Sequence, residues 1–278
     1  MGTKIPEQVM ETELSDKLKT GGLKRIKQGK VRDIYSIPGF PNLLLFVTTD
    51  RLSIFDFVLN CLVPSKGYVL NALTIFWVRQ LGISHHIVGY GRNVDNCLPV
   101  HLGDNSDFQK RAVIVENQRV LPIEFVVRGY LTGSGFKEYE SRGTVCGRIL
   151  PTGLWDGVAI PGGPIFTPTT KAEGGHDVPI DGDEVKRQYG RDVVNSALKT
   201  YSIAVDYAIS RGIVIADTKF ELSKNGFVDE ILTPDSSRFW DREEWEKAQA
   251  KKQAPGGYDK QPVRNWGKSA QDLSLIHI

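Results

Sequence analysis

Helices are predicted by apolar residues that recur at intervals of three and four along the chain. The segments with helical character cover residues 7–20, 69–81, 191–211 and 241–252. The period is clearest in the third segment, and Gly212 directly after it supplies a C-terminal stop. The fourth segment is mostly polar, and its Glu243–Lys247 pair has the one-turn spacing at which opposite charges attract on a helix.

Strands are predicted where short apolar runs stand between turn residues. These runs cover residues 23–60, 111–116, 123–128 and 213–223. Asn225-Gly226 then gives a strong hairpin signal, so the chain would return through residues 227–232. Because strands cluster early and helices mix in later, we expect an α+β fold with two domains, residues 1–120 and 121–278.

The composition excludes two broad classes of protein. Hydrophobic residues make up 40% of the chain and charged residues 24%, which is enough apolar surface to bury a core and too much for a disordered protein. The net charge is only +2, so the chain provides no broad positive field for nucleic acid. A local basic site for a small anion remains open.

Membrane and secreted classes are also disfavoured. The apolar run at residues 43–47 is far shorter than the roughly 20 residues that span a bilayer. Acidic residues between positions 7 and 16 do not fit a signal or transit peptide, and Cys61, Cys97 and Cys146 show no paired spacing. We therefore expect a cytoplasmic protein that binds neither nucleic acid nor membrane.

The segment Gly29-Lys30-Val31-Arg32 combines a glycine, whose backbone can approach a phosphate closely, with the mobile charge of a lysine. It is not a Walker A loop, because the earlier glycine of that motif is missing and Val31 replaces the Ser or Thr that would hold magnesium. From these residues alone, a polar hairpin turn explains the segment better than a phosphate loop does.

The predicted hairpin at Asn225-Gly226 carries acidic residues on both strands. Lys219 and Glu221 share one face of the first strand. A two-residue turn pairs Glu221 with Glu230, whereas a turn one residue longer pairs it with Asp229. Facing carboxylates need a cation between them, which Mg²⁺ or Lys219 would supply. A plain surface ladder is the alternative to a metal site.

Two further segments combine arginine with residues that suit anion binding. Arg128–Gly135 contains glycines and hydroxyls around an arginine, although a flexible loop also explains this pattern. Arg238 stands beside two aromatic residues and fits either a stacking pair or a clamp on a carboxylate or phosphate. Residues 151–183 are rich in Gly, Pro and Thr and too long for a passive connector, and His176-Asp177 within them is weak evidence for a catalytic dyad.

Taken together and in chain order, these segments resemble the phosphoribosylaminoimidazole-succinocarboxamide synthase (SAICAR synthetase) family. The similar blocks are Gly29–Asp33, Thr49–Asp56, Pro64–Gly67, Glu124–Gly129, Leu131–Gly135, Ile165–Pro168, Asp217–Glu221 and Asp229–Trp240. The resemblance implies an α+β fold in two parts, with an ATP-grasp-like nucleotide cleft between antiparallel sheets. It also implies that L-aspartate is ligated to the carboxylate of 5-amino-1-(5-phosphoribosyl)imidazole-4-carboxylate, with ATP and Mg²⁺, through an acyl phosphate.

The resemblance further implies roles for individual residues. The expected ATP contacts are Gly29, Lys30, Val31, Arg32, Glu124 and Lys219. The expected contacts to the ribonucleotide are Arg128, Ser134 and Arg238, with Lys66, Asp56, His176 and Asp177 on the aspartate side. The expected metal ligands are Glu221 and Asp229, which favours the longer turn, and the expected catalytic residues are Lys219, Arg128 and Asp217.

The chain departs from the family pattern in three places. Leu222-Ser223 follows the metal strand where the family has Phe-Gly, and Val178-Pro179 follows His176-Asp177 where it often has Glu-Asn. The family also carries a further helical segment after the equivalent of Asp259-Lys260-Gln261, so we expect a truncated C-terminal helix. Two other functions stay open: a phosphotransferase, although the kinase motifs are missing, and a nucleotide-binding module without catalysis.

Overall fold

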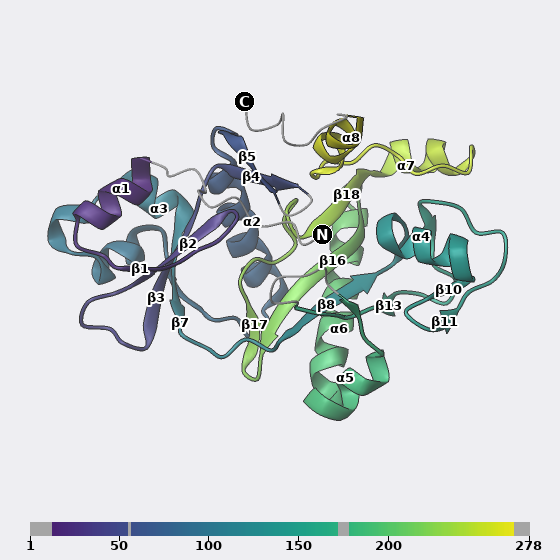
Figure 1. Cartoon of the computed structure of the whole chain (residues 1–278), viewed down its shortest axis with the longest axis horizontal. Helices are drawn as coiled ribbons and strands as arrows, with labels where there is room; N and C mark the ends of the chain where they lie inside the picture. The colour runs from purple at the N-terminus through teal and green to yellow at the C-terminus, as the bar shows by residue number, and fades with distance from the viewer. Residues whose placement is uncertain (1–12, 55–56, 172–177, 270–278) are drawn as a thin grey trace. The chain divides into compact units, whose positions relative to one another are not determined.

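The computed structural model describes residues 13–54, 57–171 and 178–269, and Figure 1 shows their helices and strands. The chain forms two compact units. Unit 1 comprises the chain up to Phe76, His85–Arg119 and the chain from Val263 onward, and unit 2 comprises Trp77–Ser84 and Val120–Pro262. The domains expected at residues 1–120 and 121–278 remain a prediction. Two segments lie on the other side of that boundary: Trp77–Ser84 belongs to unit 2, and the chain from Val263 onward belongs to unit 1.

Unit 1 is built on an antiparallel sheet of strand order β1-β2-β3-β7-β6, and β4 and β5 form a separate hairpin. Its strands are β1 (Arg25–Gln28), β2 (Arg32–Ser36), β3 (Leu43–Thr48), β4 (Arg51–Ile54), β5 (Phe57–Leu62), β6 (Ile87–Tyr90) and β7 (Ala112–Glu116). Its helices are α1 (Glu13–Thr20), α3 (Ser106–Arg111) and the 3₁₀ helices η1 (Gly91–Cys97) and η2 (Val100–Leu102). Its largest apolar cluster includes Leu18, Tyr35, Leu45, Phe108 and Ile114, which are all almost fully buried.

Unit 2 is built on a larger antiparallel sheet of order β15-β14-β8-β16-β17, in which β13 also pairs with β8 and β18 with β16. The strands of this sheet are β8 (Ile123–Arg128), β13 (Ile165–Phe166), β14 (Thr169–Thr170), β15 (Val178–Pro179), β16 (Ile213–Ser223), β17 (Gly226–Val228) and β18 (Ser237–Asp241). The two-stranded pairs are β9 (Tyr130–Leu131) with β12 (Val158–Ala159), and β10 (Thr144–Val145) with β11 (Arg148–Ile149).

The helices of unit 2 are α4 (Gly133–Arg142), α5 (Gly182–Tyr189), α6 (Arg191–Ile209) and α7 (Arg242–Gln249). Two further helices, α2 (Lys66–Leu81) and α8 (Gln261–Ser269), have residues in both units. No helix in the described part of the chain is both long and apolar enough to cross a membrane.

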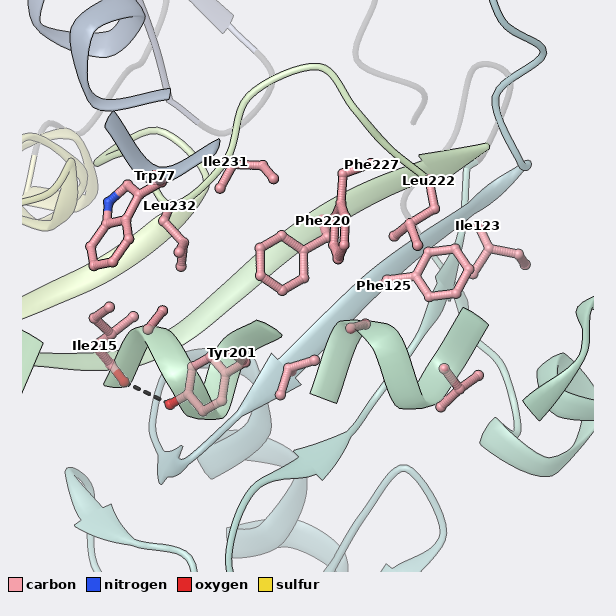
Figure 2. Packing of buried hydrophobic residues seen from close by; sticks show 14 of the residues in the cluster. Trp77, Ile123, Phe125, Tyr201, Ile215, Phe220, Leu222, Phe227, Ile231 and Leu232 are labelled. Atoms are coloured by element: carbon pink, nitrogen blue, oxygen red, sulfur yellow. Dashed lines mark hydrogen bonds between the residues drawn. The ribbon is translucent and has the colours of Figure 1, made fainter. Parts of the chain in front are cut away.

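Helix α6 covers one face of the sheet in unit 2, where β8 and β16 run side by side (Figure 2). Tyr201 of α6 is buried against this face, and its hydroxyl donates a hydrogen bond to the Ile215 carbonyl at 2.6 Å. The same hydroxyl accepts a hydrogen bond from the Gly129 amide at 3.0 Å. The helix is thereby tied to both central strands as well as packed on them.

The mixed helices and antiparallel sheets confirm the predicted α+β class, and α6 lies where the clearest helical period predicts it. The flexible loop considered for Arg128–Gly135 is wrong, because α4 begins at Gly133. Two glycines in a first turn carry low helix propensity, so packing rather than local sequence decides this helix. Residues 151–183 also hold four short strands, β12 to β15, and α3 and α5 were not predicted at all. Helix α8 begins at Gln261, where a truncated C-terminal helix was expected.

Candidate functional site

Strand β16 has one apolar and one charged face. Phe220 and Leu222 lie in the buried cluster that α6 covers (Figure 2). The alternate positions, Asp217, Lys219 and Glu221, therefore lie on the opposite face of the sheet. This is the arrangement that strand alternation predicts from the sequence.

A β-bulge between Ile215 and Asp217 changes the alternation along β16. Ile215 belongs to the same apolar cluster as Phe220, although two residues five positions apart would face opposite ways in a regular strand. The bulge therefore lets one strand contribute Ile215 to the core and Asp217 to the charged face. Asp217 is paired with Arg128 of β8, so these two side chains start from adjacent positions on the same face.

Asp217 joins two arginines into one buried cluster. Its Oδ2 atom accepts a hydrogen bond from Arg128 Nη1 at 2.7 Å and another from Arg238 Nη1. Arg128 also donates to Ser134 Oγ and to Thr167 Oγ1, both at 3.0 Å. Two guanidinium groups share this one carboxylate, and the charges of Glu138, Asp156 and Asp259 also act on them.

The surroundings keep Arg238 in place. The Asp217 carboxylate raises the pKa of Arg238, although burial opposes this effect. A Cβ atom on Gly133 would lie 2.5 Å from Arg238 Nη2, so only glycine leaves room for the guanidinium here. With 20% of its side chain exposed, Arg238 is the most accessible member of the cluster. This arrangement is typical of a site for an anionic ligand.

Lys219 lies beside carboxylates on the same face. Its Nζ atom pairs with Glu124 Oε1, and Glu124 Oε2 accepts a hydrogen bond from Thr169 Oγ1 at 3.1 Å. Burial alone would lower the pKa of Lys219, but the carboxylates of Glu124, Glu221 and Glu230 outweigh this and raise it. Lys219 is therefore a fixed cation at neutral pH and not a general base.

The register of the acidic hairpin differs from both predicted registers. Glu221 is paired with Val228, and neither Asp229 nor Glu230 stands opposite it. Ser223 pairs with Gly226, so the two-residue turn is Lys224-Asn225 rather than Asn225-Gly226. The hairpin signal located the turn within one residue, but it gave the wrong pairing.

The close packing of Gly226 explains why the turn lies one residue earlier than predicted. A Cβ atom at this position would lie 2.5 Å from the Ser84 carbonyl oxygen, and the adjacent Phe227 amide donates to that oxygen at 2.9 Å. The glycine is therefore needed for close backbone approach at the start of β17. Ser223 Oγ accepts from the Asn225 amide at 3.0 Å and so supports the turn one residue earlier.

Asp229 follows directly after Val228, with a left-handed backbone φ of 63°. This conformation ends strand alternation, so the register no longer dictates which face Asp229 takes. Glu221 pairs with Lys171 Nζ at 2.5 Å, which shows that its carboxylate takes a cation. No group of three or more His, Cys, Asp or Glu residues in the described chain could hold a metal alone. One or two carboxylates are enough for Mg²⁺ when phosphate oxygens supply other ligands, so the donor set fits.

Within unit 1, Gly29–Arg32 forms the turn between β1 and β2. The Gly29 amide donates to the Arg32 carbonyl at 2.7 Å, and a Cβ atom on Gly29 would lie 2.7 Å from the same oxygen. Val31 is buried, and Lys66 is the first residue of α2. The hairpin turn preferred from the residues alone is thus confirmed, and its role toward ATP stays a prediction.

Three residues expected on the aspartate side, Asp56, His176 and Asp177, lie outside the described residues. Thr167 and Lys171 were missed as members of the charged face. Thr167 belongs to a block that carries the family resemblance, which was the available signal. Lys171 belongs to the segment 151–183 that the sequence marks as functional, but its pairing with Glu221, 50 residues away in sequence, was not predicted.

Comparisons with known proteins agree on one family. A family model described as SAICAR synthetase matches residues 25–274. The phosphoribosylaminoimidazole-succinocarboxamide synthase of Schizosaccharomyces pombe is 42% identical over 254 residues, which cover 87% of this chain and 82% of that protein. The synthase of the same name from Pasteurella multocida is 43% identical over 256 residues, covering 88% and 86% of the two chains.

Solved structures give the same result. SAICAR synthase from Saccharomyces cerevisiae, complexed with SAICAR, matches with a TM-score of 0.76 and 34% identity, covering 97% of this chain and 93% of that one. A type-2 SAICAR synthetase in complex with ADP matches with a TM-score of 0.62 and 25% identity, covering 90% and 93%.

Proposed function

This chain belongs to the SAICAR synthetase family and is an ATP-dependent, amide-forming ligase of purine biosynthesis, and we propose that the charged face of β8 and β16 carries its reaction. L-aspartate is joined to the carboxylate of 5-amino-1-(5-phosphoribosyl)imidazole-4-carboxylate, and SAICAR, ADP and phosphate are released. The observation that carries the proposal is the pair of arginines on one carboxylate, Arg128 and Arg238 on Asp217.

The arginine cluster binds the ribonucleotide in this proposal. The guanidinium groups of Arg128 and Arg238 both lie at this site, and their positive charge attracts a phosphate or carboxylate. Ser134 Oγ, already bonded to Arg128, adds a hydroxyl to the same site. Asp217 positions both guanidinium groups, so its contribution is to hold the site in shape before the substrate arrives.

The nucleotide side uses a different set of residues. Lys219 stays protonated beside Glu124 and stabilises negative charge on the ATP phosphates. The turn residues Gly29, Lys30, Val31 and Arg32 supply further contacts to ATP. Lys66, Asp56, His176 and Asp177 are assigned to the aspartate side, as the family resemblance implies.

Glu221 and Asp229 would hold Mg²⁺. When bound, the metal supplies positive charge to the phosphate oxygens of ATP. Lys171, which pairs with Glu221, would give up that partner to the metal. The donor chemistry of the two carboxylates supports this assignment.

The reaction has two steps, formation of an acyl phosphate and attack by the amine of aspartate. Neither step needs an unusual acid or base, so positioning and charge stabilisation account for the reaction. A carboxylate oxygen of the ribonucleotide attacks the γ-phosphorus of ATP, and the bond to ADP breaks. The amine of aspartate then attacks the acyl carbon, the amide bond forms, the nitrogen loses a proton and phosphate leaves. Arg128 and Lys219 stabilise the negative charge that builds up during these steps. A cytoplasmic location, as the composition and the cysteine spacing predict, is part of this proposal.

The test is mass spectrometry of a reaction that contains the protein, ATP, Mg²⁺, L-aspartate and the ribonucleotide, with controls that omit each component. We expect the succinocarboxamide product only in the complete mixture. ADP and a phosphorylated product without aspartate would instead identify a phosphotransferase, and ATP binding without turnover would identify a binding module. Arg238→Gln tests the site, and Arg242→Gln, an exposed arginine at the start of α7, is its matched control.

A further inference from the structure

Arg51, the first residue of β4, is fully buried and is the largest such side chain in the described chain. Its Nη2 atom donates to Asp33 Oδ1 at 2.5 Å, and Nη1 donates to Asp33 Oδ2 at 3.3 Å. The Asp33 side chain is also fully buried, and Arg25 Nη1 lies 3.8 Å from its Oδ2 atom as a second cationic partner. A buried ion pair of this kind adds little net stability compared with apolar packing, so its geometry calls for another explanation.

The remaining bonds of Arg51 go to one turn. Nη2 donates to the Gly29 carbonyl at 3.0 Å, and Nε donates to the Lys30 carbonyl at 3.2 Å. Two residues earlier in sequence, Thr49 donates to the Val31 carbonyl from both its amide and its hydroxyl, each at 2.8 Å. Three consecutive carbonyls of the turn are thus bound by one short segment that follows β3.

We propose that Arg51 is a positioning residue for ATP, which fixes the Gly29–Lys30 turn in the conformation that receives the phosphates. This inference rests on the proposed function, which places ATP at that turn. The planar guanidinium reaches a carboxylate and two backbone carbonyls at once. An ammonium group is a single point of charge and cannot satisfy all of these partners in one position.

The deciding variant is Arg51→Lys, which keeps the charge beside Asp33. We expect KM for ATP to rise on the order of 10-fold, since hydrogen bonds to a charged donor are lost from the turn. KM for aspartate and for the ribonucleotide should stay unchanged. Hydrogen exchange should accelerate at the amides of residues 29–32, where the Gly29 amide now bonds to Arg32.

The matched control is Arg111→Lys. Arg111 is another largely buried arginine of unit 1, and it bonds to Asp50 and Asp107 at 3.1 and 3.0 Å. We expect this variant to lower the melting temperature and leave KM for ATP unchanged.

A purely structural role for Arg51 would lower kcat through loss of folded enzyme and leave every KM unchanged, and that result would overturn the inference. If the proposed function is wrong, the wild-type protein will form no succinocarboxamide, and this result is distinct from any effect of Arg51→Lys. In that case ADP binding by calorimetry decides: weaker binding by Arg51→Lys supports the inference. Equal binding, or no binding by the wild type, overturns it.

Discussion

Two buried clusters of arginine and aspartate use the same chemistry for different purposes. In unit 1, Arg51 meets Asp33 with both side chains fully buried, and its other bonds go to backbone carbonyls. In unit 2, Arg128 and Arg238 share the single carboxylate of Asp217, and Arg238 remains partly exposed. The partners of the arginine therefore distinguish a group that orders the backbone from a group that binds an anion: Arg51 bonds to two backbone carbonyls, whereas Arg128 bonds to the side chains of Ser134 and Thr167.

The largest effect is expected from breaking the unit 1 cluster with Asp33→Ala. This change leaves the Arg51 charge buried without its counter-ion, which costs about 3–5 kcal/mol of the free energy of unfolding. Ser15 Oγ, bonded to Asp33 at 2.7 Å, also loses its acceptor. Thermal and urea denaturation would measure the loss, with exposed Asp16→Ala of the same unit as the control. A cost below about 1 kcal/mol would contradict the account of this cluster.

Arg238→Gln should have the next largest effect, on binding rather than stability. The site loses one positive charge and its hydrogen-bond donors, so affinity for the ribonucleotide should fall by about 2 kcal/mol, roughly 30-fold. Arg128 still neutralises Asp217 in this variant, so the melting temperature should change little. Calorimetric titration of the ribonucleotide measures the affinity. Unchanged affinity in a folded variant would remove the cluster from the substrate site.

Acid should weaken unit 1 through His86, so a fall in pH separates the stability of unit 1 from ligand binding at the arginine cluster of unit 2. Burial, followed by the nearby charges of His85 and Arg32, lowers the pKa of His86 from 6.5 to about 3. Between these values the unfolded chain binds more protons than the folded one, so the free energy of unfolding falls as pH drops below about 6.5. The slope is at most about 1.4 kcal/mol per pH unit.

Denaturation of the wild type and His86→Asn between pH 7 and pH 5 checks this expectation. The substitution should flatten the decline in stability. Equal slopes in the two proteins would show that His86 is not the group responsible. Over the same pH range, the binding free energy of the ribonucleotide to the wild type should change less than the free energy of unfolding, because Arg128 and Arg238 keep their charge.

The smallest effect is expected from Lys171→Met. Lys171 and Glu221 form a partly exposed pair, which is worth about 0.2–1 kcal/mol, so its removal should raise Mg²⁺ affinity only a few-fold. Magnesium titration in the presence of ADP measures this, with exposed Lys186→Met as the control. Weaker magnesium binding in Lys171→Met would contradict the assignment of Glu221 to the metal.

The sequence predicted those parts of the site that follow from local periodicity. Alternation along β16 separates Lys219 and Glu221 from the core residue Phe220, and the structure has this arrangement. The hairpin register could not be predicted, because the position of the turn depends on the approach of Ser84 to Gly226, far apart in sequence.

The partners of buried charges were also beyond sequence reasoning. Arg51 stands in a block that carries the family resemblance, but nothing near it in sequence indicates that it binds Gly29 and Lys30. The two-arginine cluster likewise joins residues from three separate strands, β8, β16 and β18. Tertiary pairing creates both clusters, so the local pattern and the family resemblance pointed to Arg128 and Arg238 but not to their shared pairing with Asp217.

The most direct test of the difference between the two clusters is the KM for ATP and for the ribonucleotide, measured side by side in Arg51→Lys and Arg238→Gln. The account predicts a crossed pattern: Arg51→Lys raises KM for ATP alone, and Arg238→Gln raises KM for the ribonucleotide alone. A rise in the same KM for both variants, or the reverse assignment, would contradict it.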